Sequence, residues 1–324
     1  MNRYLEILKQ NPIVGAPLAD VTDLPFRKIL RRYHNGLLHT EMVSVNALMN
    51  NNKKTWDMIS NVEHEEKPLG IQLLASDDHL AEASARLISQ LQPTVIDINM
   101  GCPVRKVLKA NCGAALLDDP PRAAALVESV RAGTDIPVGV KIRLGRKNHT
   151  AREIIEALAG AGAEAVTLHG RTAHQLYRGP ADRQLVLEIV KDASLPIIVS
   201  GDVMTEDDVR ELLDGGAAGV LLARGMMGRP WFTAQAFAVA KDLPIPPTPD
   251  IKQVMLDHLD LVLEYYGDIG IRKFRRHLVE YVRGLPGAAR LRREMMVCRE
   301  PELLRDIIRG IGMTEKCVQT SEVS

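Results

Sequence analysis

One cysteine in this chain stands where a reactive thiol could be held in place. Cys102 follows the apolar run Val95–Asn99 and lies in the tripeptide Gly101-Cys102-Pro103. The run has the pattern of a short buried strand, Gly101 permits a sharp turn, and Pro103 fixes its own φ angle. An unpaired cysteine beside apolar residues is commonly a small buried hydrophobe. The alternative is a general acid, because a thiol of ordinary pKa, about 8.5, is protonated at pH 7.

Four polar side chains stand near the ends of predicted strands. Gln72, Asn99, Lys141 and His169 each alternate with apolar residues, so the period of two directs them to the opposite face, toward a common interior. An inward Gln or His is commonly a satisfied core residue, and a lysine at a strand end commonly reaches solvent. Lys141 is harder to explain in this way, because an ammonium facing the interior is unfavourable unless an anionic group meets it. Together the four predict an anionic or electron-rich ligand.

The elements that carry these residues repeat along the chain. Eight short apolar runs, whose starts are 22 to 43 residues apart, alternate with segments of helical character. The runs lie at 13–16, 37–40, 69–74, 95–99, 138–142, 165–169, 197–200 and 219–223. This alternation predicts an α/β fold with a parallel sheet, closed into a (β/α)8 TIM barrel. In such a barrel the active site lies at the C-terminal ends of the strands, which is where the polar residues fall.

Helix starts are marked by clusters of Ser, Thr and Asp. These clusters lie at 76–78, 118–120 and 205–208, where the side chains can accept hydrogen bonds from a first helical turn. The helix after the second run, near 56–60, has the weakest pattern of all.

A proline-rich segment divides the chain. Pro244, Pro246, Pro247 and Pro249 preclude a helix at 243–250 and predict an extended linker. Four segments beyond it, at 254–266, 272–283, 288–298 and 301–311, have helical periodicity and no strand pattern. We therefore predict a barrel domain at 1–242, the linker, and a small helical bundle at 251–324.

The last two predicted strands lead into a candidate phosphate site. Ser200, Gly201 and Asp202 follow strand seven, and Ala223 and Arg224 follow strand eight. Loops after these two strands commonly bind phosphate in this fold, through backbone amides and a helix N-terminus. With the polar residues further in, this position predicts an elongated cofactor with a phosphate tail and a ring-system head, such as flavin mononucleotide (FMN).

Composition limits the class of protein and its partners. The 324 residues are 46% apolar, and 41 basic residues balance 41 acidic ones, so a polyanionic partner requires a local basic patch. The four cysteines show no metal-ligand spacing, which predicts no metal site and suggests a reducing compartment. They are Cys102, Cys112, Cys298 and Cys317. The absence of a signal-like N-terminus or a run of membrane-spanning length predicts a cytoplasmic protein without a membrane partner, and we expect a monomer.

One segment of the predicted helical domain supplies a local basic patch. Between Gly270 and Arg293, eight basic residues face the single acid Glu280, a net charge of +7. The basic residues are Arg272, Lys273, Arg275, Arg276, Arg283, Arg290, Arg292 and Arg293. A charge run is commonly only a solvated helix face. Seven net positive charges beside a barrel mouth predict phosphate contacts instead, and such binding weakens steeply with salt.

With these residues in view, nearly the whole chain resembles the tRNA-dihydrouridine synthases, most closely their bacterial B-type branch. The motifs that carry the resemblance are Ala16-Pro17-Leu18-Ala19-Asp20-Val21-Thr22-Asp23, Pro25-Phe26-Arg27, Asp97-Ile98-Asn99-Met100-Gly101-Cys102-Pro103, Lys141-Ile142-Arg143, His169-Gly170-Arg171-Thr172, Arg224-Gly225 and Gly228-Arg229-Pro230. They occur in order at the ends of the predicted strands.

The resemblance implies an FMN enzyme that reduces a uridine of the tRNA D-loop, with NADPH as the hydride donor and Cys102 as the proton donor to C5. The residues that it assigns to the isoalloxazine and ribityl chain are Ala16, Pro17, Leu18, Gln72, Lys141 and His169. Those that it assigns to the phosphate are Ser200, Gly201, Asp202, Ala223 and Arg224. Asn99, Arg171 and Arg178 are expected near the uracil, and Arg272, Arg275 and Arg276 against the tRNA.

Three positions depart from the pattern of the family. The family more often has Met in place of Leu18, Asn in place of Ser200 and Gly in place of Ala223. Ser200 can still donate a hydrogen bond and Ala223 adds only a methyl group, so we expect weaker FMN retention at most.

Two other functions compete with this one. A flavin-dependent reductase or dehydrogenase of a free pyrimidine would use a similar barrel and cysteine but would not need the basic helices. A tRNA-binding protein that has lost catalysis would explain Ser200 and Ala223, but not the joint presence of Cys102, Lys141 and His169.

Overall fold

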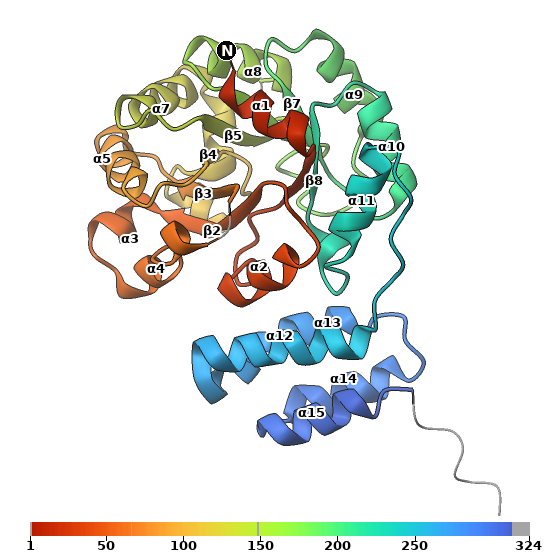
Figure 1. Ribbon diagram of the computed structural model, residues 1–324. Coiled ribbons are helices and arrows are strands. Elements are labelled where there is room, and N and C mark those ends of the chain that lie inside the picture. Colours follow the sequence, from red (N-terminus) through yellow and green to blue (C-terminus); the bar gives the residue numbers. More distant parts are fainter. Residues whose placement is uncertain (1, 66, 148, 313–324) are drawn as a thin grey trace, which may run out of the picture.

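The computed structural model describes residues 2–65, 67–147 and 149–312 and shows a ring of parallel strands surrounded by helices (Figure 1). The sheet has eight strands in the order β1-β8-β7-β6-β5-β4-β3-β2. The backbone amide of Gly15 donates to the Leu37 carbonyl across 2.8 Å, which joins the first strand to the approach to the second. The predicted TIM barrel is therefore confirmed. Its strands are β1 Ile13–Gly15, β2 Leu38–Ser44, β3 Leu69–Leu74, β4 Val95–Asn99, β5 Val138–Arg143, β6 Ala165–His169, β7 Ile197–Ser200 and β8 Gly219–Leu222.

Helices cover the outside of the barrel (Figure 1). They are α2 Leu24–Arg31, α3 Val45–Met49, α4 Lys53–Asp57, α5 Asp78–Ser89, α6 Arg105–Lys109, α7 Pro120–Ala132, α8 Ala151–Gly160, α9 Arg183–Asp192, α10 Glu206–Asp214 and α11 Phe232–Ala240. The predicted starts hold: Asp77, Asp119 and Thr205 each accept a hydrogen bond from an amide of the first turn of α5, α7 and α10.

The second β/α unit differs from the prediction. A helix was expected near 56–60, but the structure has two short helices, α3 and α4, and the second ends at Asp57. Asn52 explains the break, because its side chain accepts a hydrogen bond from the Thr55 amide and starts a new helix. The preceding strand is also longer than predicted, reaching Ser44.

The N-terminal end of the barrel is capped by a helix that sequence reasoning missed, α1 Arg3–Gln10. Its Tyr4 is 1% exposed and packs beneath β5, where a Cβ atom on Gly139 would lie 2.7 Å from the ring. Glu164, just before β6, anchors this helix because its carboxylate accepts from the amides of Arg3 and Tyr4. This end of the barrel is therefore filled by protein.

Beyond the barrel, residues 243–250 form neither helix nor strand, as predicted, and four helices follow. They are α12 Ile251–Tyr266, α13 Gly270–Tyr281, α14 Ala288–Val297 and α15 Pro301–Arg309. They lie below α2 in Figure 1 and share a buried cluster with Ile29 of α2 and Trp231 beside α11. The division at 242 and 251 stays a prediction, and residues 313–324, with Cys317, lie outside the described part of the chain. In the described part, no helix is both long and apolar enough to cross a membrane.

Candidate active site

A cavity of about 410 Å3 lies at the C-terminal ends of the strands. Its volume is within the range of about 300–1,000 Å3 that is typical of small-molecule sites. Thirteen of the predicted site residues line it: Ala16, Pro17, Leu18, Gln72, Asn99, Cys102, Lys141, His169, Ser200, Gly201, Asp202, Ala223 and Arg224. The barrel topology brings them together from the ends of seven strands, and Gln72, Asn99, Lys141 and His169 face the cavity as their strand alternation predicted.

A chain of buried hydrogen bonds fixes the turn that carries Cys102. The Gln72 amide donates to Asp97 across 2.5 Å, and the Asn99 amide donates to the Gln72 oxygen across 2.8 Å. The Asn99 oxygen then accepts from the backbone amides of Gly101 (3.2 Å) and Cys102 (2.9 Å). Both hydrogen-bonding ends of Asn99 are therefore used, and the cysteine backbone is tied to the barrel core. This orientation is what a proton donor requires.

Gly113 closes the other side of this turn. Its φ angle is +60°, and a Cβ atom there would lie 2.7 Å from the Cys102 carbonyl oxygen. The amide of Ala114 donates to the same carbonyl across 3.0 Å. Since a side chain at 113 would push the turn toward the cavity, glycine is required at this position.

Asp97, the first residue of the motif 97–103, is buried below the cavity. Burial raises the pKa of its carboxyl group, while His39, the Gln72 hydrogen bond and Lys141 act in the opposite direction. Burial likewise lowers the pKa of His39, so this imidazole is neutral. A polar layer therefore continues beneath the cavity, and it supports Gln72 and Lys141 from below.

Lys141 and His169 set the electrostatics of the cavity. Burial, followed by the neighbouring Arg143 charge, lowers the pKa of Lys141 to about 8, while Asp97 and Cys102 act to raise it. Burial, followed by Lys141 and three arginines, lowers the pKa of His169 to about 2. The imidazole is therefore neutral at physiological pH, and Lys141 supplies a positive charge whose strength depends on pH.

At the strand-seven end, the Asp202 carboxylate organises two arginines. It accepts from Arg171 and from Arg224, each across 2.5 Å, and from the Ala181 amide across 2.9 Å. Burial raises the pKa of Asp202, but the Arg171 hydrogen bond and the other contacts outweigh it and hold the pKa below its ordinary value. An anion here would meet the backbone of the turn and Arg224, not the Asp202 carboxylate.

The three positions that depart from the family pattern all belong to the cavity wall. Leu18 and Ala223 are partly buried, and Ser200 is buried at the end of β7. None of the three introduces a charge into the cavity.

Arg171 lies elsewhere than expected. It is 2% exposed and does not line the cavity among the described residues, because its guanidinium donates to the Gly179 carbonyl (2.6 Å) as well as to Asp202. Its Nη1 lies 3.3 Å from Nε2 of His169, which lines the cavity, so Arg171 lies directly behind the cavity wall, and its contact with a uracil stays a prediction. Arg178, also expected near the uracil, is exposed in the same loop, outside the cavity lining.

Two polar residues of the cavity lining, Arg143 and Tyr177, were missed by sequence reasoning. Arg143 donates to the carbonyls of Gly101 and Leu176, each across 2.8 Å, and Tyr177 stands at the mouth, 63% exposed. The guanidinium carbon lies 5.4 Å from the centroid of the tyrosine ring. Arg143 could have been found, because it has the same strand parity as Lys141. Tyr177 gave no signal, because a loop has no periodicity.

The basic face of α13 adjoins the cavity mouth. Arg272, Lys273 and Arg276 are exposed, and Arg276 donates to the Ala19 carbonyl across 3.2 Å and pairs with Asp20 at 3.6 Å. The loop that carries these partners is the one that lines the cavity between β1 and α2. Arg275 instead turns inward and donates to the Cys298 carbonyl across 3.2 Å. The predicted basic patch is thus continuous with the cavity, with Arg275 as a member of the bundle interior.

Comparisons with known proteins agree with this geometry. Residues 14–310 match the model of the dihydrouridine synthase (Dus) family. A relative named "Probable tRNA-dihydrouridine synthase" from Rhizobium leguminosarum bv. phaseoli is 35% identical over 277 residues, which is 84% of this chain and 86% of that protein. The tRNA-dihydrouridine synthase B of Pseudomonas syringae pv. tomato is 34% identical over 290 residues, 87% of this chain and 86% of that protein.

Proposed function

The chain belongs to the dihydrouridine synthase family, and from this premise we propose that it reduces a uridine in the D-loop of tRNA to dihydrouridine, using bound FMN and NADPH. One observation carries the proposal: a single cavity is lined by the Cys102 thiol and by Lys141, and the basic face of α13 adjoins its mouth. The thiol and the lysine provide the chemistry, and the surface provides the affinity for a polyanion.

The donor set of the cavity fits FMN. Lys141, Gln72 and His169 would hold the isoalloxazine ring and ribityl chain, and the turn 200–202 with Arg224 would hold the phosphate. Lys141 and Arg224 supply positive charge toward a ligand with an anionic tail, and the neutral His169 can donate or accept a hydrogen bond. Bound there in its reduced form, the flavin would supply the hydride for C6 of the uracil ring.

Cys102 would supply the matching proton. Addition of hydride at C6 leaves negative charge at C5 and its carbonyl, and the Cys102 Sγ–H donates a proton to C5. The hydrogen bonds that Asn99 Oδ1 accepts from the amides of Gly101 and Cys102 would hold the thiol at one position during this step. Lys141 interacts electrostatically with Cys102, so its ammonium would stabilise the thiolate that remains.

The base must leave its stack to reach this cavity. Tyr177 presents an exposed aromatic ring at the mouth, on which a flipped base can stack. The exposed cations of α13 would meet the flanking phosphates, because Arg276 already contacts the loop that lines the cavity. A reductase of free pyrimidines would require neither feature, and a tRNA-binding protein without catalysis would not require the organised thiol.

The purified protein tests the proposal directly. It should be yellow, release FMN on denaturation, oxidise NADPH, and form dihydrouridine in an unmodified tRNA transcript. A colourless protein that takes up no added FMN would contradict the cofactor, and turnover of free uracil but not of tRNA would favour the alternative enzyme.

The salt dependence of tRNA binding tests the surface. Arg272→Ala should weaken binding and reduce the slope of log K against log salt by about 1, as expected for one lost phosphate contact. Arg86→Ala, an exposed arginine on α5 of the barrel wall, is the matched control and should leave the slope unchanged.

A further inference from the structure

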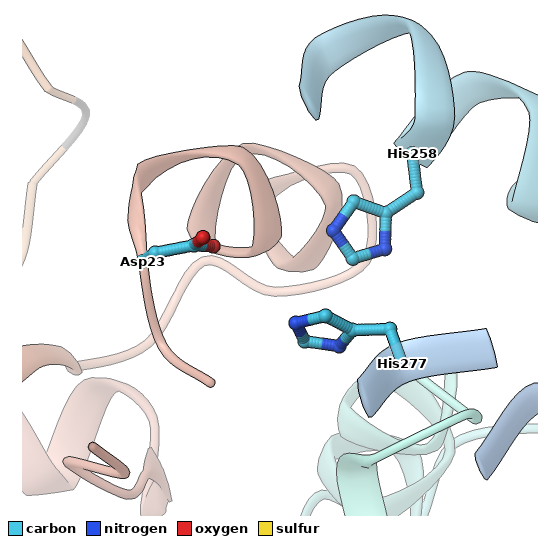
Figure 2. A group of neighbouring side chains, drawn as sticks. All are labelled: Asp23, His258 and His277. Carbon is cyan, nitrogen blue, oxygen red and sulfur yellow. The ribbon is translucent and has the colours of Figure 1, made fainter. Parts of the chain in front are cut away.

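A group of three potential metal ligands lies at the junction between the barrel and the helical domain. Asp23 begins α2, His258 lies on α12, and His277 lies on α13 (Figure 2). One ligand atom of each lies within 4.8 Å of the other two, and all three side chains are buried. Sequence reasoning predicted no metal site because it examined cysteine spacing, and these residues are far apart in the sequence.

Each of the three side chains has a hydrogen-bond partner outside the group. His258 Nδ1 is 3.1 Å from the Tyr281 hydroxyl, and His277 is hydrogen-bonded to the Val21 backbone. The Asp23 carboxylate accepts from the Tyr266 hydroxyl across 3.1 Å. Such outer partners fix the orientation of metal-binding side chains in known sites.

The remaining imidazole nitrogens are unsatisfied. His258 Nε2 and His277 Nδ1 are buried and have no hydrogen-bond partner among the described residues. A buried polar atom without a partner destabilises a fold, so two of them in one group need an explanation.

Ring packing does not supply that explanation. The centroids of His277 and Phe26 are 4.6 Å apart, and those of His258 and Phe274 are 4.8 Å apart. These contacts satisfy the faces of the rings but leave the nitrogen lone pairs without a partner.

We propose that Asp23, His258 and His277 bind one divalent transition-metal ion, with Zn2+ as the best match. Two imidazoles and one carboxylate form a common zinc ligand set. Zinc bonds of about 2.0–2.1 Å would place the donor atoms about 3.3 Å from one another, so binding would draw the three side chains closer together. The second Asp23 oxygen or a water completes four-coordination.

The role of this ion is structural. It ties the start of α2 to α12 and α13, and the chain just before α2 is the loop that lines the cavity. The ion would therefore fix the basic face of α13 relative to the cavity mouth. The site does not depend on the proposed reaction, since none of its ligands lines the cavity.

Metal analysis of the intact protein tests the site. Protein purified without chelator should contain close to one zinc per chain, and chelator-stripped protein should take up one Zn2+ or one Co2+. Bound Co2+ should show the visible absorption of tetrahedral coordination, and Zn2+ should raise the thermal unfolding midpoint. Wild-type protein that contains no metal and takes up neither ion would overturn the proposal, whether or not any variant folds.

Variants identify the ligands. His277→Gln should weaken uptake at least 100-fold, and so should Asp23→Asn, which keeps an oxygen to cap α2. His34→Gln is the matched control, because His34 is also a buried histidine but belongs to no ligand group in the described residues. Uptake that persists in the two ligand variants, or that is lost equally in the control, would contradict the assignment. Dihydrouridine formation is measured in the same variants, so that a failure of metal uptake can be told apart from a failure of the proposed function.

Discussion

Asn99→Ala should impair uridine reduction by releasing Cys102 from its fixed position, while leaving flavin reduction by NADPH nearly unchanged. The wild-type side chain makes three hydrogen bonds, one to Gln72 and one each to the amides of Gly101 and Cys102. At about 1 kcal/mol for each bond, their loss should lower the free energy of unfolding by about 3 kcal/mol, measured by urea denaturation. The thiol then loses its fixed position, so uridine reduction should fall by about 10²-fold, within the range for a general acid.

Rapid-mixing measurements of the two half-reactions give the test. Flavin reduction by NADPH does not use the thiol and should be nearly unchanged, while the reoxidation of reduced flavin by tRNA should slow. If Asn99 acts only through Cys102, the Asn99→Ala/Cys102→Ala double variant should be no slower than Cys102→Ala alone. Asn99→Asp keeps the oxygen that accepts the two amides, so it should recover most of the rate. Independent, multiplicative losses in the double variant would refute the reasoning and indicate that Asn99 contacts the uracil itself.

Three further predictions concern charge and space. The pKa of Lys141 is lowered from 10.5 to about 8, so between these pH values the unfolded chain holds more protons at this residue than the folded one. The free energy of unfolding of the flavin-free protein should therefore rise with pH across that window. Lys141→Met should remove this rise, as measured by urea denaturation at several pH values. With flavin bound, Lys141→Met should slow reoxidation of reduced flavin by tRNA below pH 8. Gly225→Ala should lower FMN retention, measured by equilibrium dialysis, because the new Cβ atom would overlap the Val203 carbonyl oxygen. Gly160→Ala is the control, because a Cβ atom there would have no neighbour within 4 Å. It should leave the thermal unfolding midpoint unchanged or raise it slightly.

The sequence predicted most of the fold because its strands are strongly periodic. Val95–Asn99 and Ala165–His169 have the bounds read from their apolar runs, and strand parity placed Lys141 and His169 in one cavity. Helix α1 was missed because its apolar face is only two buried residues long. Its amphipathic pattern is too short to stand out from a polar segment.

Loop residues and contacts across the whole chain were less predictable. Arg171 follows a strand, so its direction is set by the carbonyl of Gly179 and the carboxylate of Asp202, which lie in other loops. The meeting of Asp23 with His277 depends on how α13 docks beneath α2, and no local pattern encodes that docking. These positions are determined by tertiary packing and not by local propensity.

Tyr4 and α1 have a consequence for the order of events in a catalytic cycle. In the described residues, Tyr4 and α1 fill the N-terminal end of the barrel, so substrates reach the cavity from its opposite end, where Tyr177 lies. A nicotinamide donor and a nucleic acid are both too large to occupy this cavity mouth at the same time, so they would have to bind in succession. Steady-state rates should then follow a ping-pong pattern, with parallel double-reciprocal lines, and each substrate at high concentration should inhibit by competing with the other.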